Sequence, residues 1–146
     1  MKFRFPLQKI VDLKGNEKTQ AEWILSQALS TLREEEQFLH DLNEEIVKLQ
    51  GQLSRSSEFP VPINDIQFMQ DYITHLTRQV ELKQVDVQEA RVNVRNKQSL
   101  LTDRSMDEKV WIKAREKAMN LFTAASLKKD QLEMDEMASS KFLANK

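Results

Sequence analysis

The stretch Phe59-Pro60-Val61-Pro62 divides the chain into two long segments that contain almost no helix breakers. Between Pro6 and this stretch the only glycines are Gly15 and Gly51, and after it neither proline nor glycine occurs. Proline disfavours a helix interior by about 3 kcal/mol and glycine by about 1 kcal/mol relative to alanine. The sequence therefore permits two very long helices with one obligatory break between them.

Local chemistry predicts where these helices begin and end. We expect the first helix at about residues 6–53, with Pro6 in its first turn, where the missing N–H costs nothing. A turn at residues 54–63 should follow, because each proline holds the preceding residue extended. We expect the second helix at about residues 64–143, capped by Asn64 together with Gln67, with Asp65 at the positive end of the helix dipole.

Apolar residues recur in alternating steps of four and three along both segments, which is the spacing of a coiled-coil seam. The predicted seam of the first helix is Leu7, Val11, Lys14, Lys18, Ala21, Leu25, Ala28, Leu32, Glu35, Leu39, Leu42, Ile46, Leu49 and Leu53. That of the second helix is Ile66, Met69, Ile73, Leu76, Val80, Lys83, Val87, Ala90, Val94, Lys97 and Leu101. Only lysines and one glutamate interrupt this register.

Together these signals predict an all-α fold in which two long helices form an antiparallel coiled-coil hairpin. We treat residues 1–146 as a single coiled-coil domain. At 1.5 Å per residue the helices should be roughly 70 Å and roughly 115 Å long, which places Leu7 near Trp111. The second helix should then overhang beyond Trp111 with an exposed apolar stripe, unless it breaks near Ser105 and folds back as a third helix.

Composition excludes several classes of function. Charged residues make up 31% of the 146 residues, the net charge is −1, and there is no cysteine. The near-neutral charge does not favour nucleic acid, and no apolar run reaches the length of a signal peptide or the roughly 20 residues of a membrane span. We expect a soluble cytoplasmic protein without direct membrane insertion. Residues 2–18 carry a net charge of +3, whereas residues 34–45 hold six acidic residues and no lysine or arginine.

Motifs for catalysis or cofactors are missing. The chain has no glycine-rich phosphate loop, and neither His40 nor His75 has a histidine or cysteine three or four residues further along the helix. The cluster Glu34-Glu35-Glu36 lacks the alternating ligands and glycine of a calcium loop. We therefore expect no enzyme activity, no cofactor and no metal.

Four stretches resemble the FliJ family, which comprises small coiled-coil components of the bacterial flagellar type III export apparatus. They lie in order along the whole chain: Phe3-Arg4-Phe5-Pro6-Leu7-Gln8-Lys9-Ile10 with Leu13-Lys14-Gly15-Asn16-Glu17-Lys18, then Met69-Gln70-Asp71-Tyr72-Ile73-Thr74-His75-Leu76, then Glu108-Lys109-Val110-Trp111-Ile112-Lys113, and finally residues 128–138.

The resemblance implies a fold like the central stalk of rotary ATPases. It implies that both chain ends bind and stimulate a hexameric flagellar export ATPase and that the turn side reaches the cytoplasmic domain of a membrane export gate. It also implies a role in handling flagellar substrate chaperones, and a peripheral location at the cytoplasmic face of the cell membrane.

The resemblance implies candidate binding residues at each end of the hairpin. At the ATPase end we expect Phe5, Leu7, Lys9, Trp111, Phe122, Leu132, Met134, Asp135 and Glu136, where apolar side chains supply buried area and charged ones fix the register. At the gate end we expect Phe38, Leu42, Leu49, Phe68, Tyr72 and Leu76. Packing offers another interpretation of the gate residues, because the three leucines lie on the seam and the three rings beside it.

Two other classes of function fit a helical hairpin. One is a prefoldin-like holdase that grips unfolded clients with its open ends, although the residues around the turn show no alternating strand pattern. The other is a structural spacer that dimerises through parallel helices, which would leave Pro60 and Pro62 inside a helix.

Overall fold

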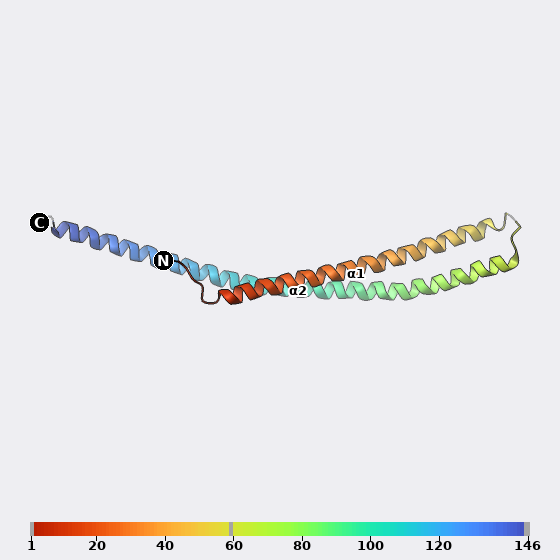
Figure 1. The fold of residues 1–146 in the computed structure, drawn as a ribbon, viewed down its shortest axis with the longest axis horizontal. Coiled ribbons are helices and arrows are strands. Elements are labelled where there is room, and N and C mark those ends of the chain that lie inside the picture. Colours follow the sequence, from red (N-terminus) through yellow and green to blue (C-terminus); the bar gives the residue numbers. More distant parts are fainter. Residues whose placement is uncertain (1, 59, 145–146) are drawn as a thin grey trace. The chain divides into compact units, whose positions relative to one another are not determined.

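The computed structural model describes residues 2–58 and 60–144 and contains two helices, α1 (Gln8–Arg55) and α2 (Ile63–Ala144), shown in Figure 1. The fold is all-α, as predicted, and α2 is the longer helix. The alternative in which α2 breaks near Ser105 is not observed, because residues 63–144 form one helix.

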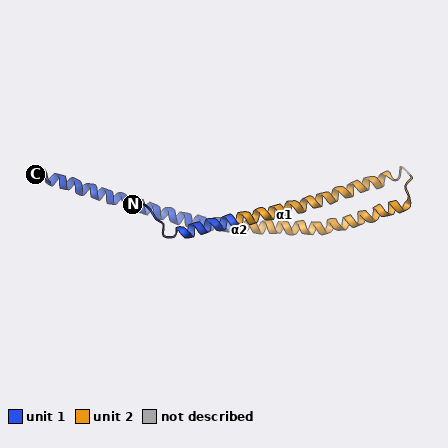
Figure 2. Ribbon diagram, viewed as in Figure 1, with its two compact units in different colours: residues 1–20, 102–146 blue, residues 21–101 orange. Residues whose placement is uncertain are grey.

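The chain divides into two compact units (Figure 2). Unit 2, residues 21–101, contains the connection between the helices. It also contains the adjoining parts of α1 and α2, which run antiparallel to each other. Unit 1, residues 1–20 and 102–146, contains the start of α1, the residues before it and the second half of α2.

The helix ends depart in detail from the predicted ones. The backbone N–H groups of Asp65 and Ile66 both donate to the carbonyl of Pro62, so α2 starts at Ile63. Asn64 therefore lies inside the first turn, and its predicted role as the cap is wrong. Asp65 lies in this turn and opposes the positive end of the helix dipole, as expected.

The end of α1 uses serine side chains. Ser56 Oγ donates to the carbonyl of Leu53, and Ser57 Oγ donates to that of Ser54 at 2.7 Å. These bonds satisfy acceptors that a helix C-terminus leaves without an intrahelical partner. Phe59, in the predicted turn, lies outside the described residues.

The predicted seam is confirmed from Val11 onward, whereas Leu7, its predicted first position, is exposed. From Val11 to Leu53 and from Ile66 to Leu101, every seam position is buried or half-buried. The most buried side chains all lie on it, namely Ala21, Ala28, Leu76, Val80, Val87 and Val94. Two helices can exclude water only along the strip where they touch, so the core is one row of side chains on each helix.

Candidate binding surfaces

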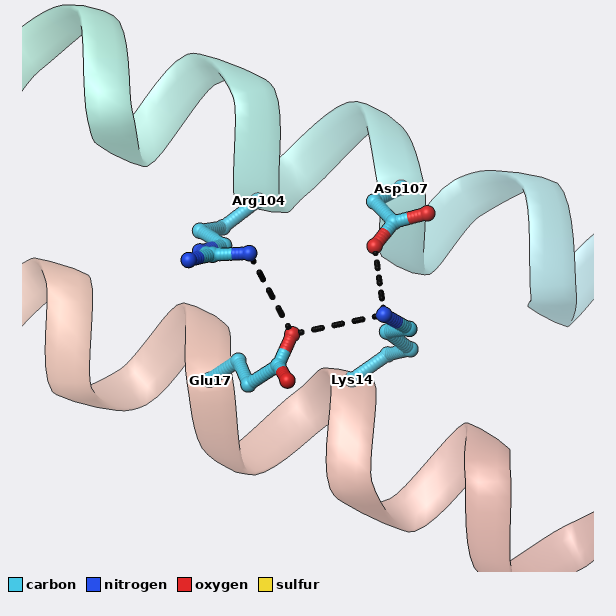
Figure 3. A network of polar contacts seen from close by, with 4 residues as sticks. All are labelled: Lys14, Glu17, Arg104 and Asp107. Atoms are coloured by element: carbon cyan, nitrogen blue, oxygen red, sulfur yellow. Dashed lines mark ion pairs between the residues drawn. The ribbon is translucent and has the colours of Figure 1, made fainter.

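A polar network joins α1 to α2 in unit 1 (Figure 3). Lys14 Nζ lies 2.9 Å from Asp107 Oδ2 and 3.5 Å from Glu17 Oε2, and Arg104 approaches the same Glu17 oxygen at 3.6 Å. Lys18 Nζ pairs with Glu108 Oε1 at 3.4 Å. The two lysines that interrupted the predicted seam of the first helix therefore meet carboxylates across the interface.

Gly15 lies within this network. A Cβ atom at this position would be 3.2 Å from Glu108 Oε2, which is tighter than ordinary van der Waals contact. The missing side chain lets the carboxylate of Glu108 approach the backbone of α1 while its other oxygen accepts from Lys18.

The residues before α1 cover one face of α2. The rings of Phe3 and Phe122 lie 5.5 Å apart at 53°, and Arg115 Nε donates to Gln8 Oε1 at 2.8 Å. The start of α1 thus lies about one helical turn beyond Trp111, its predicted neighbour. Phe5, Trp111, Ala118 and Phe122 are half-buried on this side. We name residues 2–6 the strap.

The last part of α2 extends past the strap, and we call its residues 121–144 the overhang. From residue 127 to residue 144 every described side chain is exposed to solvent. At about 100° per residue, Leu121, Leu132 and Leu143 fall on one side of the helix and Leu127, Met134 and Met137 on the opposite side. We call these sets the leucine stripe and the methionine stripe; each member is 57–70% exposed.

The ATPase-end candidates fall into two groups. Phe5, Trp111 and Phe122 are half-buried, and Leu7 and Lys9 are exposed at the start of α1. Leu132 and Met134 belong to opposite stripes of the overhang, and Asp135 and Glu136 are exposed beside them. Within the first group Phe122 contacts Phe3 of the strap, and the second group is exposed to solvent.

The gate-end candidates divide between the seam and one flank of unit 2. Leu76 is buried and Leu42 and Leu49 are half-buried, all on the seam. Phe38, Phe68 and Tyr72 are 52%, 72% and 40% exposed, and their heptad positions put all three on the same side of the seam. Leu82, which the sequence did not single out, is exposed on this side as well.

We call this side the aromatic flank and the other the polar flank. The ring of Tyr72 stacks on His75 with centroids 6.4 Å apart, and Lys83 Nζ lies 4.4 Å from the centre of the Phe38 ring. On the polar flank Arg91 pairs with Glu36 at 3.5 Å, and among residues 21–58 and 60–101 no phenylalanine, tyrosine or tryptophan occupies its heptad positions. Leu82 follows Phe68 by two heptads, and this spacing was the sequence signal that would have revealed it.

Other kinds of site find no support in the residues described. Within residues 2–58 and 60–144, no three histidine, cysteine or acidic side chains are grouped so that they could hold a metal ion. Neither helix has, over its described length, an apolar segment long enough to cross a bilayer.

Comparison with known proteins agrees with this architecture. The profile of the family described as "Flagellar FliJ protein" matches residues 2–146. The Flagellar FliJ protein of Bacillus subtilis (strain 168) is 25% identical over 146 residues, covering 98% of this chain and 97% of that protein. A solved structure of a YscO homolog from Chlamydia trachomatis has the same fold, with a TM-score of 0.64, 20% identity and 94% coverage of both chains. Because the family profile spans nearly the whole sequence, this chain belongs to the FliJ family of flagellar proteins.

Proposed function

We propose that this chain is a stalk-like component of flagellar type III protein export that binds two partners through separate surfaces. The overhang of α2 and the strap bind the hexameric export ATPase and stimulate its turnover. The aromatic flank binds the cytoplasmic domain of the membrane-embedded export gate. This role would hold the protein at the cytoplasmic face of the cell membrane through its partners, and it needs no catalytic residue of its own.

The observation that carries this proposal is the pair of opposite apolar stripes on the overhang. A helix that lies on one surface needs one apolar stripe, and a second stripe on the far side would stay in water. Two opposite stripes suit a helix that is enclosed on both sides, as in the central hole of a ring. Exposed leucines and methionines at this density are typical of a surface that binds a partner.

The two stripes suit different contacts. Methionine has a flexible, polarisable side chain that adapts to varied surfaces. Met134 and Met137 can therefore accommodate neighbouring ring subunits that present different conformations. Leu121, Leu132 and Leu143 supply apolar area at about 25 cal/mol per Å² buried.

ATP turnover by the cognate export ATPase tests the first half of the proposal. We would compare the full chain with Leu132→Glu on the leucine stripe and Met134→Glu on the methionine stripe. Each substitution should raise the concentration needed for half-maximal stimulation more than tenfold, on the order of 2 kcal/mol, because binding would bury a carboxylate.

Ser140→Glu is the matched control, because helical spacing places Ser140 between the stripes and the substitution adds the same charge. It should leave stimulation close to that of the unchanged protein. Loss of stimulation from only one stripe would mean that the overhang lies on a single surface and is not enclosed. No stimulation by the unchanged chain under ring-forming conditions would end the stalk proposal.

The second half is tested by binding to the gate's cytoplasmic domain. Phe38→Ser and Phe68→Ser should weaken this binding, since both remove exposed rings from the aromatic flank. Val47→Ser is the control, because Val47 is 67% exposed on the polar flank. Equal effects of all three substitutions would show that the aromatic flank has no special role.

A further inference from the structure

Acidic side chains are concentrated on the aromatic flank of unit 2. Heptad spacing assigns to it Glu34, Asp41, Glu45, Asp65, Asp86 and Glu89, against the two basic residues Lys48 and Arg55, which gives a net charge of −4. The polar flank has three acidic residues, Glu22, Glu36 and Glu81, and three basic residues, Arg33, Arg91 and Arg95, with a net charge of zero. The charge excess and the exposed rings therefore share one side of the coiled coil.

The carboxylates lie close to the exposed apolar residues. Helical neighbours three or four residues apart lie on the same face, about 5–6 Å between Cβ atoms. By this spacing Phe38 lies between Glu34 and Asp41, and the three line one surface hollow, with Arg33 and Gln37 at its border. Asp65 lies three residues before Phe68, and Asp86 lies four residues after Leu82. Phe38, Phe68 and Leu82 thus each have an anionic neighbour on the same helix.

Lys83 illustrates which side chain such a site accepts. Its Nζ atom lies 4.4 Å from the centre of the Phe38 ring and 2.7 Å from Glu35 Oε2, so one lysine contacts an aromatic face and a carboxylate together. A cation over a ring face is attracted by the ring quadrupole. Lysine and arginine also have long apolar stems that can cover a ring while the charged head reaches a carboxylate.

We propose that the aromatic flank of unit 2 is a docking surface for a basic amphipathic segment of a partner protein. Apolar side chains of that segment contact Phe68, Tyr72 and Leu82, and its lysines or arginines pair with Glu34, Asp41 and Asp86. The inference rests on the proposed gate contact and assigns the chemistry of the gate's complementary surface. The acidic field of the flank also accelerates encounter with a basic partner, and salt weakens this effect.

Charge argues against other occupants of this flank. A second copy of the same flank would bring two surfaces of net charge −4 together, and like charges at an interface are unfavourable. Nucleic acid and anionic lipid headgroups carry the same sign of charge as the flank. A basic protein segment satisfies both the rings and the carboxylates.

The experiment measures association rates of the full chain with two probes at low and high salt. One probe is the gate's cytoplasmic domain, and the other is a short amphipathic peptide of leucine and lysine. The variant Glu34→Lys with Asp41→Lys reverses two charges on the aromatic flank. The matched control, Glu22→Lys with Glu81→Lys, reverses two charges on the polar flank. Circular dichroism establishes that all variants remain helical.

We expect the aromatic-flank reversal to slow association with both probes by on the order of tenfold at low salt and by little at high salt. The polar-flank reversal should change neither by more than about twofold. The neutral variant Glu34→Gln with Asp41→Asn should give an intermediate rate, which separates loss of attraction from new repulsion.

The two probes distinguish failure of the inference from failure of the proposed function. If the gate domain binds with the same rate to all variants at all salt concentrations, the basic-segment inference is wrong and the gate contact stands. If the peptide depends on Glu34 and Asp41 but the gate domain does not bind at all, the flank selects basic segments and the gate proposal is wrong. Equal slowing by the reversals on both flanks would overturn the assignment to this surface.

Discussion

Lys83 Nζ lies 2.7 Å from Glu35 Oε2, and these two residues are polar seam positions contributed by opposite helices. Asp86 lies 3.4 Å from the same ammonium, and the Phe38 ring covers it. The seam therefore contains a matched ionic layer between apolar ones. Such a layer favours one register, because sliding either helix by a heptad would set the lysine and the glutamate against apolar residues.

Leucine substitutions of Glu35 and Lys83, singly and together, test how this ionic layer contributes to the thermal midpoint. Glu35→Leu alone should lower the thermal midpoint, because Lys83 keeps its charge and loses its main partner. Glu35→Leu together with Lys83→Leu should restore or raise the midpoint, because this layer of the seam then becomes apolar and no charge is left without its partner. Thermal unfolding followed by circular dichroism compares the three proteins. A double variant less stable than the single variant would show that the layer contributes more than register.

Alkaline pH should weaken both lysine-centred contacts. The hydrogen bond to Glu35 raises the pKa of Lys83 above its ordinary value of 10.5, and the bond to Asp107 does the same for Lys14. Since the folded pKa exceeds the unfolded one, the stabilisation is complete below pH 10.5 and is lost as pH rises through the folded pKa.

The thermal midpoint of the unchanged protein should therefore fall more steeply above pH 10.5 than that of a Lys14→Met, Lys83→Met variant. Parallel curves for the two proteins would mean that these lysines do not couple protonation to folding.

The two glycines should respond differently to alanine. Gly51→Ala should stabilise the protein by about 0.5–1 kcal/mol, because alanine favours helix and its Cβ would meet nothing within 4 Å. Gly15→Ala should stabilise less, since its Cβ would press on Glu108. Denaturant unfolding of both variants measures the difference. Equal gains would mean that Glu108 moves aside freely.

Replacing a small seam residue of unit 2 by a larger one should destabilise the protein. Ala28 is 5% exposed, so the helices leave no room for extra methyl groups there. Ala28→Leu should destabilise the protein by about 1–3 kcal/mol through overpacking. Ala124→Leu, at an exposed position of α2, should stay within about 0.5 kcal/mol and controls for helix propensity. An increase in stability from Ala28→Leu would show that the helices can separate locally at little cost.

The contact between the strap and α2 should depend on the packing of the Phe3 and Phe122 rings. Phe3→Ala and Phe122→Ala should show a coupling of about 0.5–1.5 kcal/mol in a double-mutant cycle, which is typical of packed rings. In a Trp23→Phe background Trp111 is the remaining tryptophan, and its emission should shift to the red when the strap detaches. An unchanged spectrum in the Phe3→Ala variant would show that the strap does not shield Trp111.

Sequence alone determined the fold, because each signal for it acts over short distances. The absence of breakers between Pro62 and the end of α2 permits one long helix, the prolines enforce a connection, and the four-three spacing selects the buried stripe. The same spacing identified Phe38, Phe68 and Tyr72 as residues beside the seam. The start of α2 was predicted less well, because the helix begins at Ile63, one residue before the expected Asn64, where the N–H groups of Asp65 and Ile66 donate to the Pro62 carbonyl.

Only the tertiary structure decided which residues from different helices meet. Lys14, Lys18 and Lys83 were interruptions in a one-dimensional pattern, and their carboxylate partners lie 93, 90 and 48 residues away. The strap's contact with Phe122 likewise depends on the register between α1 and α2. Register is set by the summed packing and charge of the whole interface, so no local stretch of sequence contains it.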